Sequence, residues 1–304
     1  MSSRPKVVLT DELPPLAPEQ VNAAVRAAFA ALGAGRAEQP PQSVLPLERG
    51  GDVITYTAAL HDAALFCLKV SPYLPQPEGG AVVTAWTLLV STRSGLPLLL
   101  VDAAGLTALR TAATTALAVD LLARPDARRL LVVGSGQAAR EHVRHVRAVR
   151  PFDEVAMHAR AGVPPGTAAG LGVTVAPDLA AAVRRADVVC LCTSAAEPVV
   201  DLAGFAGGTL VTSISTNAPM AHEVAPEALA AADVYCDYAP AAMAAAGEVR
   251  LAGQAGWWSP EQLRGDLPGL LAGNAPLPTG DRPVFFRSVG LGIEDAAVAA
   301  LLLD

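Results

Sequence analysis

A short glycine-containing loop carries the strongest chemical signal in the sequence. The stretch LLVVGSGQAA runs from Leu130 to Ala139 and contains a GxGxxA motif between a predicted strand and a predicted helix. In such a loop Gly134 permits a tight turn, Gly136 lets the backbone approach a pyrophosphate, and Ala139 lets the helix pack closely on the strand. Because the N-terminal N–H groups of the helix are free to bind phosphates, the loop predicts a dinucleotide site.

The choice between NAD and NADP is made at the end of the next predicted strand, in VAMHAR. An acidic residue there would accept the ribose 2′-hydroxyl of NAD, whereas an arginine pairs with the 2′-phosphate of NADP. No Asp or Glu ends this strand, and Arg160 follows it. We therefore expect NADPH to be preferred and NADH to be possible, although a solvated arginine is about as common at such a position.

Two cations interrupt apolar segments elsewhere in the chain. Lys69 lies in FCLKV and Arg110 in LTALRTAA. A cationic side chain in an apolar element must either pair with an anion or reach the solvent-exposed edge of the element. A structural ion pair or a snorkelling stem explains either residue alone. Beside a dinucleotide loop, the two together indicate a pair that binds the carboxylate of a substrate.

The predicted elements place these residues in different layers of structure. The chain begins with an amphipathic helix over residues 18–32, followed by short strands between Gly and Pro residues. Strands are predicted at 43–47, 53–58, 64–70, 82–91 and 98–101. This pattern is typical of an antiparallel, meander-like sheet, which suits a substrate domain. Arg110 lies on a long Ala-rich helix over 106–122.

The middle of the chain alternates strands and helices. The glycine loop joins a strand at 129–133 to a helix at 137–149, and further elements follow at 154–158, 179–184, 188–193, 209–214, 226–231 and 234–236. Such alternation predicts a doubly wound parallel sheet of the Rossmann type. A terminal strand over 284–290 and a helix over 293–303 are expected to return to the first domain. The predicted fold is therefore α/β, with residues 1–112 and 281–304 forming one discontinuous α+β domain and 113–280 the other.

The composition argues against several classes of function. Of the 304 residues 52% are hydrophobic and 4% aromatic, which suits helices packed on a parallel sheet. The net charge is −7 and the 22 Lys and Arg residues are scattered, so we expect no nucleic-acid partner. The four cysteines show no CxxC spacing, so we expect no metal. No apolar signal segment or membrane span is evident, and a cytoplasmic location is expected by default.

Several segments together resemble the ornithine cyclodeaminase/μ-crystallin family. They are GLTALRTAATTALAVDLLA, VVGSGQAAREH, STNAPMAHEV, GEVRLA and VFFRSVGLGIEDAAVA, in this order. The resemblance covers nearly the whole chain and is strongest to the ketimine reductase members. It implies a substrate-binding and dimerisation domain made of both chain ends, a Rossmann domain between them, and a homodimer.

Three departures from the family pattern bear on the reaction. Gln42 stands where many members have an arginine that holds the substrate carboxylate, and Phe286-Arg287-Ser288 replaces the usual FKS. Asn217 stands where the cyclodeaminases have a catalytic aspartate. Because a neutral amide can neither pair strongly with a cation nor act as a base, Asn217 disfavours cyclodeamination of ornithine.

We therefore expect an NAD(P)H-dependent ketimine reductase that converts Δ1-pyrroline-2-carboxylate or Δ1-piperideine-2-carboxylate to L-proline or L-pipecolate. Lys69 and Arg110 would hold the carboxylate and Asn217 would orient the ring nitrogen. Lys69, Tyr56, His61 or water would supply the proton. The alternatives are an ornithine cyclodeaminase and a non-catalytic NADPH-binding protein of the crystallin kind. The expected cofactor contacts are Thr111, Gly134, Ser135, Gly136, Gln137, Ala138, Arg160, Thr193, Ser288, Val289 and Gly290.

Overall fold

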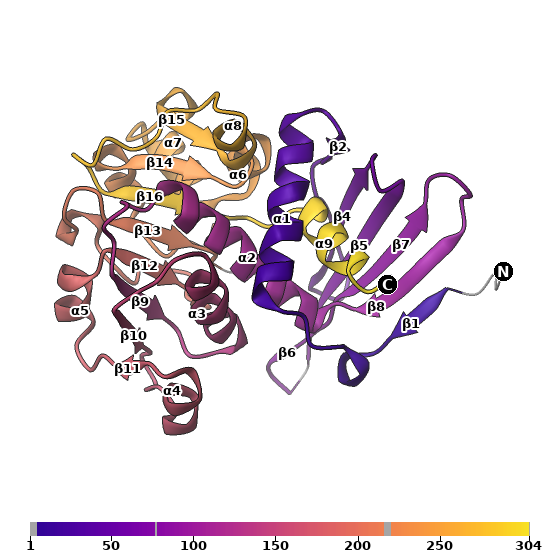
Figure 1. Ribbon diagram of the computed structural model, residues 1–304, viewed down its shortest axis with the longest axis horizontal. Helices are drawn as coiled ribbons and strands as arrows, with labels where there is room; N and C mark the ends of the chain where they lie inside the picture. Colours follow the sequence, from indigo (N-terminus) through magenta and orange to yellow (C-terminus); the bar gives the residue numbers. More distant parts are fainter. Residues whose placement is uncertain (1–4, 77, 216–219, 304) are drawn as a thin grey trace. The chain divides into compact units, whose positions relative to one another are not determined.

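The computed structural model describes residues 5–76, 78–215 and 220–303. The chain divides into two compact units, and Figure 1 labels most of their helices and strands. Unit 1 consists of Met1–Arg110 and Leu291–Asp304, and unit 2 of Thr111–Gly290. One of the two boundaries falls inside a single helix, α2 (Ala104–Leu122).

Unit 1 is built on a mostly antiparallel sheet with the strand order β1-β8-β7-β5-β4-β2, in which β3 pairs with β4 and β6 with β5. The long strand β4 alternates between buried and partly exposed residues, because successive side chains of a strand point to opposite faces. β1 was not predicted from the sequence and runs parallel to β8. The elements are β1 (Lys6–Val8), the 3-10 helix η1 (Thr10–Glu12), α1 (Pro18–Gly33), β2 (Ala37–Glu38), β3 (Ser43–Pro46), β4 (Asp52–Leu60), β5 (Leu65–Pro75), β6 (Ala81–Val83), β7 (Trp86–Ser91), β8 (Pro97–Asp102), the start of α2, and α9 (Gly292–Ala300).

The C-terminal helix α9 packs on this sheet. It contacts β4, β5 and β7, and α1 lies beside it (Figure 1). A Cβ atom on Gly292 would lie 2.6 Å from the carbonyl oxygen of Thr57, so the start of α9 can approach β4 this closely only with a glycine. This approach places the first turn of α9, which carries Glu294 and Asp295, over the buried face of the sheet.

Unit 2 contains a parallel sheet with the strand order β11-β10-β9-β12-β13-β16-β14-β15. The order runs in opposite directions on either side of β9, and ligands bind such sheets outside the carboxyl ends of the strands at this switch point. The elements are β9 (Arg129–Val133), α3 (Gln137–Val149), β10 (Glu154–His158), α4 (Pro165–Leu171), β11 (Thr174–Val175), α5 (Leu179–Arg185), β12 (Val188–Leu191), η2 (Leu202–Gly204), β13 (Leu210–Ser213), η3 (Pro226–Ala231), β14 (Asp233–Cys236), α6 (Ala239–Ala245), α7 (Gly247–Ala255), η4 (Pro260–Gln262), β15 (Leu263–Asp266), α8 (Leu267–Leu271) and β16 (Val284–Arg287).

The position of β16 corrects one predicted boundary. The sequence placed residues 281–304 together with the N-terminal part of the chain. In the structure β16 pairs in parallel with both β13 and β14, so it is an internal strand of the unit 2 sheet. Its four residues are all buried, which an internal strand covered on both faces requires. The return to unit 1 begins after Gly290.

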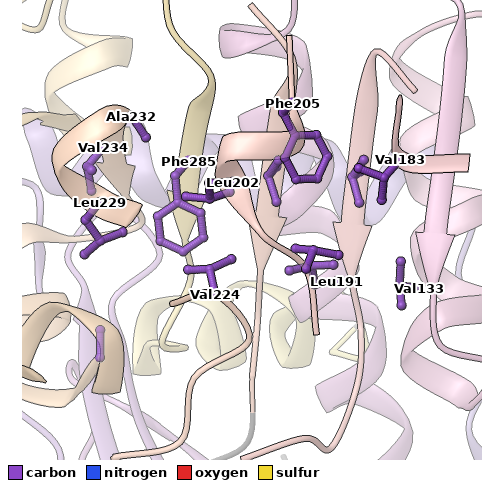
Figure 2. Close-up of a cluster of buried hydrophobic side chains, with 14 of the residues drawn as sticks. Val133, Val183, Leu191, Leu202, Phe205, Val224, Leu229, Ala232, Val234 and Phe285 are labelled. Atoms are coloured by element: carbon purple, nitrogen blue, oxygen red, sulfur yellow. The ribbon is translucent and has the colours of Figure 1, made fainter. Parts of the chain in front are cut away.

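A hydrophobic core lies on one face of the parallel sheet, shown in Figure 2. Alternate residues of the strands contribute to it, such as Val133, Leu191 and Phe285. The α5 residue Val183 and the η3 residue Leu229 pack against them. Because Leu130 and Val132 on the opposite face are equally buried, the sheet is covered on both sides. The α/β fold with a doubly wound Rossmann-type sheet is confirmed.

Two further expectations concern membrane spans and metal sites. Within the described ranges, no helix has the length and apolar character needed to cross a membrane. The described residues also contain no group of three or more His, Cys, Asp or Glu side chains placed to hold a metal ion.

Candidate active site

The glycine loop after β9 adopts a conformation that requires glycine at its first position. Gly134 has a φ of +129°, and its N–H donates to the carbonyl oxygen of His158 at 2.7 Å. A Cβ atom on Gly134 would lie 2.4 Å from the carbonyl oxygen of Cys192 and 3.4 Å from the Cβ atom of Ala139. The turn therefore joins β9 closely to the ends of β10 and β12.

The N-terminus of α3 presents backbone N–H groups without a helical partner. Gly136 is the N-cap residue, and among the described residues no side chain caps the helix. The N–H groups of residues 137–139 precede the first helical hydrogen bond, which runs from the Arg140 N–H to the Gly136 carbonyl. A Cβ atom on Gly136 would meet no atom within 4 Å. These open donors and this space fit the pyrophosphate of a dinucleotide.

A buried carboxylate, Glu223, holds the carboxyl ends of two neighbouring strands. Its Oε1 accepts hydrogen bonds from the backbone N–H and the hydroxyl of Thr193, at 2.9 and 2.6 Å. Its Oε2 accepts from the Ser213 hydroxyl at 2.7 Å and from the Ser215 N–H at 2.8 Å. Thr193 follows β12, and Ser213 ends β13. Glu223 thus fixes the loops at the edge of the sheet where ligands bind in this fold.

A second buried carboxylate, Asp237, follows β14 and organises the loop after β16. Its Oδ2 accepts from the Ser288 hydroxyl and from the N–H groups of Val289 and Gly290, at 3.1, 2.6 and 3.0 Å. Its Oδ1 accepts from the Tyr238 N–H at 2.7 Å. Burial raises the pKa of Asp237, and these hydrogen bonds partly oppose the increase.

The two carboxylates change how four predicted cofactor residues can act. The N–H and hydroxyl of Thr193, the hydroxyl of Ser288, and the N–H groups of Val289 and Gly290 all donate to Glu223 or Asp237. These donors are therefore occupied within the protein. A cofactor contact by these residues would use their other atoms.

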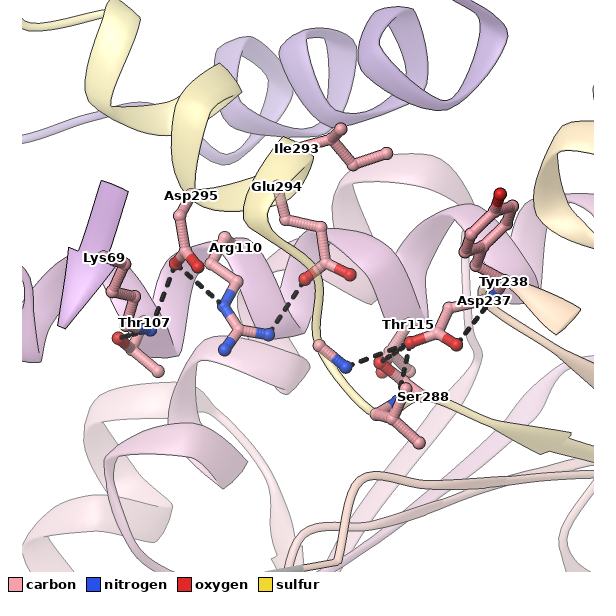
Figure 3. A network of polar contacts seen from close by, with 12 residues as sticks. Lys69, Thr107, Arg110, Thr115, Asp237, Tyr238, Ser288, Ile293, Glu294 and Asp295 are labelled. Carbon is pink, nitrogen blue, oxygen red and sulfur yellow. Dashed lines mark hydrogen bonds and ion pairs between the residues drawn. The ribbon is translucent and has the colours of Figure 1, made fainter. Parts of the chain in front are cut away.

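Unit 1 contains a buried chain of alternating charges, shown in Figure 3. The Lys69 ammonium lies 3.1 Å from Asp295 Oδ1 and also donates to the Thr107 hydroxyl at 2.8 Å. The Arg110 guanidinium lies 3.3 Å from the same Asp295 oxygen through Nε and 2.9 Å from Glu294 Oε2 through Nη1. One oxygen atom of Asp295 therefore bridges the two predicted carboxylate-binding cations.

The sheet and the helix α9 enclose this cluster. Tyr56, Lys69 and Thr87 are direct partners across β4, β5 and β7, so they lie in one row on one face of the sheet. The Lys69 ammonium lies 5.4 Å from the centre of the Tyr56 ring. All three side chains are buried, as are Glu294 and Asp295.

Burial and the paired charges act in opposite directions on the two cations. Burial lowers the pKa of Lys69, and the carboxylate of Asp295 partly opposes the decrease. Burial would also lower the pKa of Arg110, but Asp295 and Glu294 outweigh it and raise that pKa. Arg110 is thus a permanent cation, whereas Lys69 gives up its proton more readily than an exposed lysine.

Comparison with known proteins supports the family indicated by the sequence motifs. The sequence profile of the ornithine cyclodeaminase/mu-crystallin family matches residues 12–304. The chain belongs to this family. A relative in the family, an NAD(P)H-dependent anabolic L-arginine dehydrogenase of Pseudomonas aeruginosa, is 47% identical over 291 residues, which are 92% of this chain and 90% of the relative.

Solved structures show the same fold. Δ1-pyrroline-2-carboxylate reductase of Thermococcus litoralis, in complex with NADH and L-proline, matches with a TM-score of 0.88 and 24% identity over 98% of this chain and 96% of that one. Iminosuccinate reductase of Paracoccus denitrificans, in complex with NAD+, matches with a TM-score of 0.87 and 25% identity over the same shares of the two chains. These similarities support the predicted class, an enzyme of an oxidoreductase family. The predicted ketimine reductase activity is not confirmed, because the relative that is 47% identical is an amino-acid dehydrogenase.

The remaining predicted residues differ in their exposure and in their place in the fold. Arg160 is exposed just after β10, and Thr111 is partly buried on α2. Gln42 is partly exposed before β3, and Asn217 lies outside the described residues. His61, one of the proton-donor candidates, has a side chain that is 49% exposed and lies 3.5 Å from the Glu38 carboxylate.

Sequence reasoning missed how the buried acids act. Glu294 pairs with Arg110, and Asp295 pairs with Lys69. Two adjacent acids at the start of an otherwise apolar helix, GIEDAAVAA, were the available signal. Asp237 had no such signal, because the partners of its Oδ2 lie about fifty residues later in the chain.

Proposed function

We propose that the chain is an NAD(P)H-dependent oxidoreductase that transfers hydride to the C=N carbon of an α-imino acid. The observation that carries the proposal is the 47% identity, over nearly the whole chain, to an enzyme named as an L-arginine dehydrogenase. The proposed substrate is the imine that the 2-oxo acid of arginine forms with ammonia, and the product is L-arginine.

The glycine loop is the proposed site of the dinucleotide. Residues Gly134, Ser135, Gly136, Gln137 and Ala138 would surround the pyrophosphate, because this turn and the start of α3 carry the open N–H groups. The reduced nicotinamide supplies the hydride when it is bound. Arg160 would pair with a 2′-phosphate, so NADPH is the proposed preference and NADH a possible substitute.

The cluster in unit 1 is the proposed site of the substrate carboxylate. Lys69 and Arg110 are cations held at fixed positions by Asp295, which is the pre-organisation that carboxylate binding needs. Once hydride has reached carbon, the nitrogen takes up a proton to become an ammonium group. Lys69, with its lowered pKa, and the neighbouring Tyr56 are the proposed buried donors for that proton.

Cyclic imino acids form the second candidate substrate class. Δ1-pyrroline-2-carboxylate and Δ1-piperideine-2-carboxylate carry the same C=N carbon next to a carboxylate, so the same cations and the same hydride would serve. Asn217 would then orient the ring nitrogen by a hydrogen bond. Cyclodeamination of ornithine is disfavoured by Asn217, and a non-catalytic binding protein would leave all of these substrates unchanged.

The purified protein should oxidise NADPH faster than NADH when given the 2-oxo acid of arginine and ammonia. Loss of the reduced-nicotinamide absorbance and chromatographic detection of L-arginine would measure this reaction. Parallel reactions with the two cyclic imino acids, and an ammonia assay on L-ornithine, separate the other candidates. Proline without arginine would favour the cyclic class, and ammonia from ornithine would contradict the argument from Asn217.

The carboxylate site is tested by Arg110→Ala. The loss of a buried charged hydrogen bond should raise the KM for the imino acid by on the order of a hundredfold in Arg110→Ala, with little change in the KM for NADPH. Because Arg110→Ala also leaves Glu294 and Asp295 without this partner, its unfolding temperature should be measured in parallel. An unchanged KM for the imino acid in a folded variant would refute the assignment.

The protein is also proposed to act as a homodimer formed through unit 1. Apolar side chains are exposed on strands of unit 1, among them Leu45 on β3 and Val83 on β6. Large exposed apolar side chains that gather on one surface are typical of an interface. Light scattering after gel filtration should give twice the mass of the chain, and Leu45→Lys with Val83→Lys should lower it. A monomeric mass for the unaltered protein would exclude this assembly.

A further inference from the structure

The charges around Lys69 and Arg110 balance one another. Among the described residues, three ion pairs join the cations Lys69 and Arg110 to the carboxylates of Glu294 and Asp295. The cluster therefore contains two cations and two carboxylates. All four side chains are at least nine-tenths buried.

A third carboxylate would disturb this balance. If the carboxylate of a ligand bound to Lys69 and Arg110, the buried cluster would carry one excess negative charge. An uncompensated charge in a low-dielectric interior is strongly unfavourable. A ligand that brings a cationic group next to its carboxylate would restore neutrality.

One carboxylate oxygen of the cluster has no hydrogen-bond donor among the described residues. Asp295 uses Oδ1 for both Lys69 and Arg110, whereas its Oδ2 is buried without a hydrogen-bond partner among the described residues. A buried carboxylate oxygen without a donor is costly, so it is a ready acceptor. In an α-imino or α-amino acid the nitrogen is attached to the carbon next to the carboxylate. A ligand whose carboxylate contacted the cations that Oδ1 bridges would therefore carry its nitrogen on the same side of the molecule, and Oδ2 is the acceptor that we assign to it.

We propose that Asp295 and Glu294 select ligands whose α-carboxylate is accompanied by a cationic α-nitrogen, with Asp295 Oδ2 accepting a hydrogen bond from that nitrogen. The inference rests on the proposed function and specifies the protonated form of its imine substrate. The oxo acid brings a carboxylate and no cation at the reacting end, so it binds weakly and the imine is the species that is reduced.

The matched ligand pair is L-arginine and 5-guanidinopentanoate, which differ in the α-ammonium group alone. Calorimetric titration of the full chain with oxidised dinucleotide present should show L-arginine binding roughly tenfold to a hundredfold more tightly, as expected for one charged hydrogen bond. Asp295→Asn should reduce the ratio of the two affinities about tenfold, because L-arginine should bind more weakly and 5-guanidinopentanoate more tightly.

Two further variants control the measurement. Glu294→Gln removes a charge but keeps Asp295, so the affinity for 5-guanidinopentanoate should rise while the affinity for L-arginine does not fall. Asp233→Asn removes a buried carboxylate at the start of β14, in unit 2, and should leave both affinities unchanged. If Asp295→Asn does not fold, the proposal is still tested by the affinities of the unaltered protein and of Glu294→Gln for the two ligands.

The outcomes separate this inference from the proposed function. Equal affinities of the unaltered protein for the two ligands, or an unchanged ratio in a folded Asp295→Asn, would overturn the inference even if the protein reduces imines. Failure of the unaltered protein to bind either ligand and to oxidise NADPH with any imino acid would instead overturn the proposed function, and the inference with it.

Discussion

Replacing Glu223 with glutamine tests whether one buried carboxylate holds the carboxyl ends of β12 and β13. The native side chain accepts four hydrogen bonds, two on each oxygen. On each oxygen, one donor is a backbone N–H and the other is a hydroxyl. A hydroxyl can turn to accept a hydrogen bond, but a backbone N–H cannot.

The magnitude follows from this arrangement. The amide group of the introduced glutamine has one oxygen and one NH2, so in either orientation the NH2 faces the N–H of Thr193 or of Ser215. One buried N–H then loses its acceptor, at about 1–3 kcal/mol, and the remaining bonds lose their charged partner. We expect a total destabilisation of about 2–4 kcal/mol, which lowers the unfolding temperature by about 4–8 °C in a chain of this size.

Thermal unfolding followed by circular dichroism measures this change, and Ser213→Ala is the matched control. Ser213→Ala removes one hydroxyl donor and leaves both N–H bonds to Glu223, so it should cost only about 1 kcal/mol. Titration with dinucleotide adds a second readout, because the displaced Thr193 loop should weaken dinucleotide binding more in Glu223→Gln than in Ser213→Ala. Equal unfolding temperatures for the unaltered protein and Glu223→Gln would refute the reasoning.

Three further predictions address the glycine loop, the cofactor and a buried histidine. Gly134→Ala should lower both stability and dinucleotide affinity, because its Cβ would lie 2.4 Å from the Cys192 oxygen. Gly136→Ala should leave the stability unchanged and lower the dinucleotide affinity alone. Equal unfolding temperatures for the two variants would contradict this difference. Arg160→Ala should raise the KM for NADPH roughly tenfold or more and that for NADH little, and equal effects on both would remove the 2′-phosphate argument. Burial lowers the pKa of His142 from 6.5 to about 4, so the unfolded chain binds the extra proton as the pH falls through this range and the folded protein loses up to about 3 kcal/mol of stability. Chemical unfolding at pH 6.5 and pH 4 should show a smaller loss in His142→Gln, and the same loss in both proteins would exclude His142 as the cause.

Much of the fold and one part of the candidate site could be predicted from local sequence patterns. The alternation of strands and helices indicates a parallel sheet, and the GxGxxA motif places its turn between β9 and α3. Gly134 could be recognised because its role depends on its own backbone conformation and on immediate neighbours. Lys69 and Arg110 stood out because a charged residue is rare in an apolar element.

The partners of those charges could be found only in three dimensions. Lys69 and Asp295 are separated by 226 positions, and Arg110 and Glu294 by 184. Their pairing depends on α9 returning to the sheet of unit 1 and on the close approach that Gly292 permits. The location of β16 was decided in the same way, since its apolar residues suit either sheet and only its pairing with β13 and β14 assigns it. Local patterns determine which elements form, because turns and periodicity act over a few residues. Which buried charges neutralise one another is decided by packing, because the free energy of a buried charge depends on whichever opposite charge the folded chain brings within a few ångströms.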